Sequence, residues 1–153
     1  MNIRYMTVED AKEICDWEYP GEYDIYNIGG FKKAKDNNWG ISKEDIRVKQ
    51  FRSVLNDNGE LIGYFRFKTL PGKVILGLGL APEICGKGIG KSFMKFILNT
   101  EELKDKLIEL EVREFNKRAI NCYIGAGFKI KGKEEKETLN GKDIFVIMEK
   151  KNV

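Results

Sequence analysis

Short segments of hydrophobic residues at strand or helix spacing run along this chain, separated by turn-forming residues. Residues 2–5 predict a first strand. Thr7 and Asp10 then form a capping box that starts a helix. The apolar residues of this helix recur at helical spacing: Val8, Ala11, Ile14 and Cys15. Residues 19–38 are rich in aromatic residues but lack a clean period, and we expect one short helix in them, near residues 28–34.

The middle of the chain predicts three strands. Residues 46–55 and 61–67 have strand-like patterns on either side of Asn56-Asp57-Asn58-Gly59, a strong hairpin turn. Pro71-Gly72 turns the chain into residues 74–80, an almost wholly apolar run that is typical of a strand buried on both faces.

Helices and strands alternate in the second half. Glycines at residues 86–90 lead into a helix with one apolar face, formed by Ile89, Phe93, Phe96 and Ile97. Residues 107–112 predict a strand, after which Asn116 caps a short helix. The chain ends in a predicted hairpin: residues 128–138 and 142–150, joined at Leu139-Asn140-Gly141.

This order of elements predicts a mixed α/β (α+β) fold: a twisted, largely antiparallel sheet of about seven strands with helices on both faces. No repeat, low-complexity segment or linker divides the sequence. Since 153 residues suffice for one buried core, we expect residues 1–153 to form a single domain.

Composition narrows the chemistry. The chain contains no histidine, which excludes Ser-His-Asp hydrolysis, Cys-His proteolysis and histidine-bearing zinc sites. Its three cysteines lie far apart and form no CxxC, so we expect neither a redox dithiol nor a metal site. Acid–base chemistry must therefore come from carboxylates, tyrosine, lysine or cysteine. Without histidine to activate it, a cysteine nucleophile is not favoured.

Charge and hydropathy exclude two classes of partner. The net charge of +3 is too small and too evenly spread to indicate nucleic-acid binding. The longest apolar stretch is strand-sized and far short of a membrane span. The first ten residues carry charge where a signal peptide needs an apolar run, and free thiols fit a reducing compartment. We expect a cytoplasmic protein without a nucleic-acid or membrane partner.

The segment Gly86-Lys87-Gly88-Ile89-Gly90-Lys91 is the first candidate binding site. Glycines let the backbone approach a ligand closely, and the first N–H groups of the following helix can hold an anion such as a pyrophosphate. The two lysines add positive charge. The alternative interpretation is an ordinary glycine-rich turn. Neither the Walker-loop spacing nor the dinucleotide GxGxxG spacing is present, which excludes those two kinds of nucleotide site.

Two ordered motifs resemble the GNAT superfamily of N-acetyltransferases. Leu78-Gly-Leu-Ala-Pro82, followed by Cys85-Gly-Lys-Gly-Ile-Gly90, is similar to the acetyl-CoA-binding motif, but Cys85 replaces its Gln or Arg. Leu110-Glu-Val-Arg113, Asn116-Lys-Arg-Ala119 and Tyr123 resemble the second motif. This second motif is similar to that of bacterial enzymes that acetylate the N-terminal alanine of a ribosomal protein.

The resemblance implies an enzyme that transfers acetyl from acetyl-CoA directly to a primary amine, in a small molecule or at a protein N-terminus. It also implies that the pantetheine arm inserts where strands 74–80 and 107–112 splay apart. Members of the family often form homodimers. The implied cofactor contacts are Leu78, Gly79, Leu80, Cys85, Gly86, Lys87, Gly88, Ile89, Gly90, Lys91, Ser92 and Asn116.

The same resemblance implies catalytic roles for two residues. It makes Tyr123 the general acid that protonates the CoA thiolate, a role compatible with a ring packed in the core. Glu111, twelve residues earlier, matches the glutamate assigned as base in the alanine acetyltransferases. On an alternating strand Glu111 shares a face with Arg113, so a mere surface pair is the alternative. Glu83 and a water-mediated route are further candidates for removing the proton.

The aromatic segment is a candidate acceptor site, because aromatic faces and carboxylates together suit a cationic amine. A hydrophobic cluster that anchors a lid is the alternative. The segment comprises Trp17, Tyr19, Tyr23, Tyr26, Phe31 and Trp39, interleaved with Glu18, Glu22 and Asp24. A second function also stays open: a non-catalytic acyl-CoA-binding or regulatory domain. Cys85 and the lack of a glutamate in residues 74–80 favour that function, whereas Tyr123 argues against it.

Overall fold

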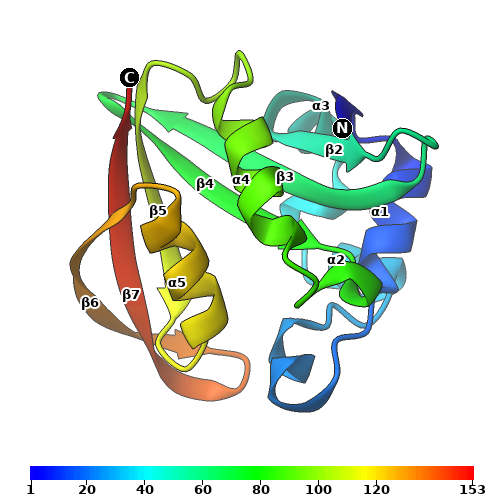
Figure 1. The fold of residues 1–153 in the computed structure, drawn as a ribbon. Coiled ribbons are helices and arrows are strands. Elements are labelled where there is room, and N and C mark those ends of the chain that lie inside the picture. Colours follow the sequence, from blue (N-terminus) through cyan, green and yellow to red (C-terminus); the bar gives the residue numbers. More distant parts are fainter. The chain divides into compact units, whose positions relative to one another are not determined.

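The computed structural model describes residues 1–153 (Figure 1), and its strands form one seven-stranded sheet in the order β1-β2-β3-β4-β5-β7-β6. The pairings β1–β2, β2–β3, β5–β7 and β6–β7 are antiparallel and β4–β5 is parallel. The predicted mixed, largely antiparallel sheet is therefore confirmed. The strands are β1 Asn2–Tyr5, β2 Phe51–Leu55, β3 Leu61–Leu70, β4 Lys73–Leu80, β5 Lys106–Arg113, β6 Lys129–Thr138 and β7 Gly141–Asn152.

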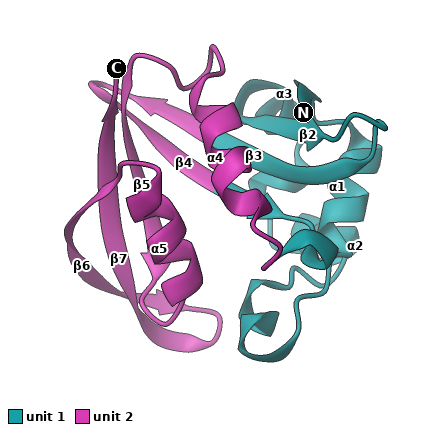
Figure 2. Cartoon of the chain, in the orientation of Figure 1, with its two compact units in different colours: residues 1–66, 78–85 teal, residues 67–77, 86–153 magenta.

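The helices lie in the order that the sequence predicts, with one addition. They are α1 Val8–Cys15, α2 Phe31–Asp36, α3 Glu44–Gln50, α4 Ile89–Leu98 and α5 Lys117–Gly125, with short 3-10 turns η1 Gly21–Tyr26, η2 Gly40–Ser42 and η3 Pro82–Ile84. None of these helices has the length and apolar character needed to cross a membrane. Figure 2 shows two compact units: residues 1–66 with 78–85 form unit 1, and residues 67–77 with 86–153 form unit 2.

Helix α3 is the addition and corrects the predicted strand over residues 46–55. The chain is helical to Gln50, and strand β2 begins only at Phe51. Ile46 and Val48 mimic the alternation of a strand, but acidic residues in the first turn and basic residues in the last suit the helix dipole. Arg47 is buried and donates a hydrogen bond to the Ile41 carbonyl, while Val48 faces solvent.

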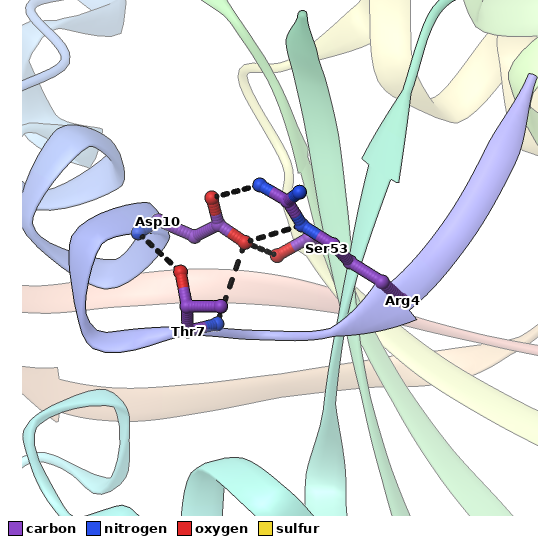
Figure 3. Close-up of polar contacts among 4 residues, drawn as sticks. All are labelled: Arg4, Thr7, Asp10 and Ser53. Carbon is purple, nitrogen blue, oxygen red and sulfur yellow. Dashed lines mark hydrogen bonds and ion pairs between the residues drawn. The ribbon is translucent and has the colours of Figure 1, made fainter. Parts of the chain in front are cut away.

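In unit 1, the buried carboxylate of Asp10 at the start of α1 binds side chains from two strands (Figure 3). The Asp10 carboxylate accepts hydrogen bonds from Arg4 at 2.8 and 3.2 Å and from the Ser53 hydroxyl at 2.8 Å. The backbone N–H of Asp10 in turn donates to the Thr7 hydroxyl, which confirms the predicted capping box. Burial acts to raise the pKa of Asp10, but the donors from Arg4, Ser53 and Thr7 outweigh it and lower that pKa. One carboxylate thus joins β1, α1 and β2.

Strand β5 organises unit 2. It pairs with β7 over its whole length and with β4 at Val74–Ile108 and Ile75–Glu109. Its side chains alternate as predicted: Ile108, Leu110 and Val112 are buried, whereas Glu111 is exposed. Both helices of the unit bury one face, α4 through Phe93, Met94, Ile97 and Leu98 and α5 through Ile120.

The apolar strand β4 departs from the expectation that both of its faces are buried. In unit 2, Val74 and Leu76 are buried, but Ile75 between them is half-buried and Gly77 is exposed. The apolar run reflects one buried face and one partly open face. The ladder with β5 ends at Ile75, and β4 continues beyond it.

Candidate functional site

The carboxyl end of β4, in unit 1, is a glycine-containing strand end covered by an aromatic ring. A Cβ atom at Gly79 would lie 2.6 Å from Tyr64 Cε1, closer than any real contact, so this position requires glycine while the ring stays in place. Burial raises the pKa of Tyr64, which keeps the hydroxyl protonated. Leu78 and Leu80, on either side of Gly79, are half-buried.

The main chain at this strand end is held by two hydrogen bonds. The Tyr19 hydroxyl donates to the Leu80 carbonyl at 2.7 Å, and the Ala81 N–H donates to the Ile62 carbonyl at 2.9 Å. Burial is the main cause that raises the pKa of Tyr19, so its phenol remains a donor. Tyr19 therefore has a structural role that its place in the aromatic segment does not indicate.

The short turn after β4 contains Glu83 and ends at Cys85. The Cys85 Sγ lies 3.5 Å from the Ala81 carbonyl and 3.7 Å from the Leu80 carbonyl, so the thiol turns back onto the strand end. The acetyl-CoA-binding motif that this segment resembles has Gln or Arg here, whereas this chain has the short side chain of Cys85. Glu83 is exposed on η3, and its charge contributes, after burial and Asp10, to raising the pKa of Glu13.

The glycine loop, in unit 2, has the backbone geometry of an anion cradle. Gly86 and Gly88 both have φ of +77°, and Gly88 is the N-cap of α4. No side chain caps this helix, and its first turn contains no acidic residue. The first N–H groups of α4 and the exposed Lys87 and Lys91 therefore make the loop electropositive. The Ser92 hydroxyl donates to the Ile89 carbonyl at 2.9 Å.

A third cation lies beside the loop. A Cβ atom at Gly86 would lie 3.5 Å from Nη1 of Arg118, which stands in the first turn of α5. Arg118 is exposed and thus accessible to an anion at the loop. The sequence alone does not indicate Arg118 as a site residue. Its only signal is its place in the Asn116-Lys-Arg-Ala119 motif, and its proximity to Gly86 arises only on folding.

Helix α5 carries the two further predicted residues. Asn116 is its N-cap and accepts a hydrogen bond from the Ala119 N–H at 3.1 Å, which confirms the predicted cap. Tyr123 is half-buried, with its ring 6.1 Å from the Phe128 ring, centroid to centroid. Burial raises the pKa of the neighbouring Cys122 thiol, so it is a poor nucleophile.

Glu111 lies on the exposed face of β5 and accepts a hydrogen bond from Lys136 of β6. Arg113 instead pairs with Asp143 of β7 at 2.6 Å. The surface pair Glu111–Arg113, which the sequence left open as an alternative, is therefore replaced by two separate ion pairs. Arg113 pairs with the neighbouring strand β7, and Glu111 pairs with β6, on the far side of β7.

The aromatic segment of unit 1 divides into a packed part and an exposed part. Trp17 belongs to the core of this unit, and Tyr19, Phe31 and Trp39 pack against it. Glu18, Glu22 and Asp24 are exposed. These four aromatic residues anchor the segment, as in the second interpretation above, while the carboxylates face solvent.

Comparison with known proteins identifies the class. The family model "Acetyltransferase (GNAT) family" matches residues 11–128. The chain is 28% identical over 123 residues to UPF0157 protein YqkA of Bacillus subtilis, covering 78% of this chain and 34% of that protein. It is 30% identical over 77 residues to peptidyl-lysine N-acetyltransferase YiaC of Escherichia coli, covering 50% of this chain and 49% of that protein. The chain thus spans a third to a half of the length of these relatives.

Solved structures share the fold at low sequence identity. A phosphinothricin acetyltransferase from Sinorhizobium meliloti, in complex with AcCoA, aligns with a TM-score of 0.66 and 17% identity over 97% of this chain and 86% of that one. The ribosomal-protein-S18-alanine N-acetyltransferase of Escherichia coli aligns with a TM-score of 0.62 and 16% identity over 97% and 91%. The fold is that of an N-acetyltransferase. The chain belongs to the GNAT acetyltransferase family.

Proposed function

We propose that residues 1–153 act as one acetyl-CoA-dependent N-acetyltransferase domain that moves acetyl directly to a primary amine. The observation that carries this proposal is the glycine loop: in a member of this family, two glycines with positive φ lead into an uncapped helix N-terminus flanked by lysines. That arrangement suits the diphosphate of coenzyme A.

The proposed cofactor contacts are main-chain groups and side chains in three segments: the glycine loop, the start of α5 and the end of β4. In unit 2, the N–H groups of Gly86, Gly88, Ile89 and Gly90 bind the diphosphate, and the side chains of Lys87, Lys91 and Arg118 neutralise its charge. Ser92 and Asn116 complete this set. In unit 1, the backbone of Leu78, Gly79 and Leu80 offers hydrogen bonds to pantetheine amides, with Cys85 at its end. The half-buried state of these strand residues leaves them accessible to such a ligand.

The proposed chemistry needs one proton acceptor and one proton donor. An alkylammonium, with a pKa of about 10, must lose a proton before its nitrogen can attack the thioester carbonyl. Glu111 takes that proton, directly or through a water. The new C–N bond forms and the C–S bond breaks, and Tyr123 gives its phenolic proton to the departing thiolate. The second proton that the nitrogen loses passes through solvent and restores the phenol. The exposure of Glu111 on β5 supports its role, since an acceptor can reach it from solvent.

The acceptor in this proposal is a cationic amine. The exposed carboxylates Glu18, Glu22 and Asp24 supply a negative potential on the segment after α1. The name of the Escherichia coli relative, a peptidyl-lysine N-acetyltransferase, is consistent with an amine acceptor. A non-catalytic acyl-CoA-binding domain is the second candidate, favoured by the ion pair that engages Glu111 and by the thiol of Cys85 where the family has Gln or Arg.

Calorimetric titration with acetyl-CoA, desulfo-CoA and ATP tests the binding half of the proposal. We expect micromolar or tighter binding of the two CoA compounds and none of ATP. Gly88→Val, which forces a β-branched side chain into a left-handed backbone, should abolish that binding. Absence of heat with acetyl-CoA for the wild-type protein would refute the assigned role of the glycine loop.

A further inference from the structure

One face of the sheet in unit 2 carries a group of polar and aromatic side chains around the carboxyl end of β5. The strand register pairs Arg113 with Phe145 and Glu111 with Ile147 across β5 and β7, and pairs Lys136 with Asp143 across β6 and β7. Because opposed residues in a ladder point to the same face, Glu111, Arg113, Lys136, Asp143 and Phe145 gather there.

Within this group, the ammonium of the Lys136 side chain contacts a carboxylate and an aromatic ring. The Lys136 Nζ donates a hydrogen bond to Glu111 Oε2 and lies 5.8 Å from the centroid of the Phe145 ring. The hydrogen bond to Glu111 is the largest cause that raises the pKa of Lys136, so this group is charged at neutral pH. A carboxylate and an aromatic face are the two elements that recognise an ammonium ligand.

Lys136 pairs with Glu111 because the nearer carboxylate in the ladder, that of Asp143, pairs with Arg113. Asp143, opposite Lys136 in the ladder, is occupied by Arg113 at 2.6 Å, and the Arg113 guanidinium lies 5.0 Å from the Phe145 ring. Nearby Glu134 and Glu109 add electrostatic attraction for the Lys136 ammonium. The Lys136 and Glu111 side chains remain 36% and 40% exposed, so an incoming cation can compete for the same contacts.

We propose that Glu111 and Phe145 form the subsite for the ammonium group of the acceptor, and that Lys136 occupies this subsite until a primary alkylamine displaces it. This inference rests on the proposed function, in which Glu111 takes the proton of the acceptor. Lys136 is then an internal competitor: the apparent affinity for an alkylammonium is reduced by the fraction of molecules in which Lys136 holds the subsite.

The test is an NMR titration with n-butylammonium chloride, a probe with the length of a lysine side chain. Wild-type protein and Lys136→Ala are titrated at constant ionic strength, following the backbone amides of Glu111 and Phe145. Because a partly exposed ion pair contributes at most about 1 kcal/mol, the dissociation constant should be lower in Lys136→Ala by up to about fivefold. Phe145→Leu, added to Lys136→Ala, should weaken binding again.

Lys133→Ala is the matched control. Lys133 lies on the same strand and pairs with Glu114, but it is opposite Val146 and therefore on the other face. This variant should bind n-butylammonium as the wild type does. Lys136→Met, which keeps most of the aliphatic stem, should reproduce Lys136→Ala and thereby excludes a mere change in folding.

Equal dissociation constants for the wild type and Lys136→Ala would overturn the inference, as would the absence of n-butylammonium binding to Lys136→Ala. The titration uses no acetyl-CoA and no turnover. A failure of the proposed function is seen separately, as a lack of acetyl-CoA binding in calorimetry.

Discussion

The hydroxyl of Tyr19 donates a 2.7 Å hydrogen bond to the carbonyl of Leu80, 61 positions later in the chain. This bond ties the segment after α1 to the last residue of β4. Tyr19→Phe leaves the Leu80 carbonyl without this donor. We expect a loss of about 1 kcal/mol in the free energy of unfolding, measured by urea denaturation. Tyr5→Phe, at a residue that is 61% exposed, is the control and should cost much less.

The contact between Gly79 and Tyr64 predicts a steric effect. Gly79→Ala places a methyl group 2.6 Å from Tyr64 Cε1 and should destabilise unit 1 by about 2 kcal/mol. Replacing Tyr64 by leucine in the same chain should make the Gly79→Ala change far less costly, since the ring is gone. Gly132→Ala on β6, where a Cβ atom meets nothing within 4 Å, should be nearly neutral. An equal effect at both glycines would refute the assigned clash.

Because the Asp10 carboxylate is buried and hydrogen-bonded, we expect the free energy of unfolding to depend on pH. Its pKa lies below the ordinary value of 3.8, so the unfolded chain binds the proton more readily than the folded chain. The stabilisation from the carboxylate is therefore fully present only well above pH 3.8, and it is lost as the pH falls through the lowered pKa. Asp10→Asn should cost about 2 kcal/mol at pH 7. Urea denaturation at pH 7 and near pH 3 should show that cost shrinking, and a constant difference would contradict the role of the charge.

Arg118 beside the glycine loop predicts a selective loss of affinity. Arg118→Gln should weaken acetyl-CoA binding about tenfold, the effect of one charge-assisted hydrogen bond. Binding of S-acetyl-pantetheine, which lacks the diphosphate, should not change. Calorimetry with 3′-dephospho-acetyl-CoA separates the phosphates: the loss persists if Arg118 binds the diphosphate and disappears if it binds the 3′-phosphate. Lys117→Gln, the same charge change one residue earlier, is the control.

We expect a substitution at Tyr123 to change the turnover rate but not the affinity for acetyl-CoA. If its phenol protonates the thiolate, Tyr123→Phe should lower turnover about a hundredfold and leave acetyl-CoA affinity unchanged, because the ring still packs against Phe128. Steady-state rates and calorimetric titrations of the same preparation measure both quantities. Turnover equal to that of the wild type would remove the acid role.

Local signals in the sequence were sufficient for most of the fold. The capping box at Thr7 and Asp10, the Asn116 cap and the glycine loop before α4 depend on neighbouring residues, and all three are present as predicted. Helix α3 was missed because Ile46 and Val48 have the spacing of a strand. The feature that decides for the helix, the buried Arg47 bound to Ile41, is a tertiary contact.

The candidate site could be predicted only in part, for a similar reason. The glycines and Tyr123 stand in motifs, so the sequence indicates them directly. Arg118 lies beside Gly86, which stands 32 positions earlier in the chain. Lys136 donates a hydrogen bond to Glu111, which stands 25 positions earlier. No periodicity in the sequence encodes such pairs, because strand register and helix packing determine them.

Release of coenzyme A from acetyl-CoA in the presence of a panel of primary amines tests directly whether this chain is an N-acetyltransferase. Thiol release is followed with and without each amine, and the acetylated product is identified by mass spectrometry. We expect amine-dependent release with an acetylated amine as product, and a large loss of rate in Tyr123→Phe. Tight binding of acetyl-CoA with no amine-dependent release across polyamines, lysine peptides, peptide N-termini and amino sugars would contradict the proposed acetyl transfer and favour a non-catalytic acyl-CoA-binding domain.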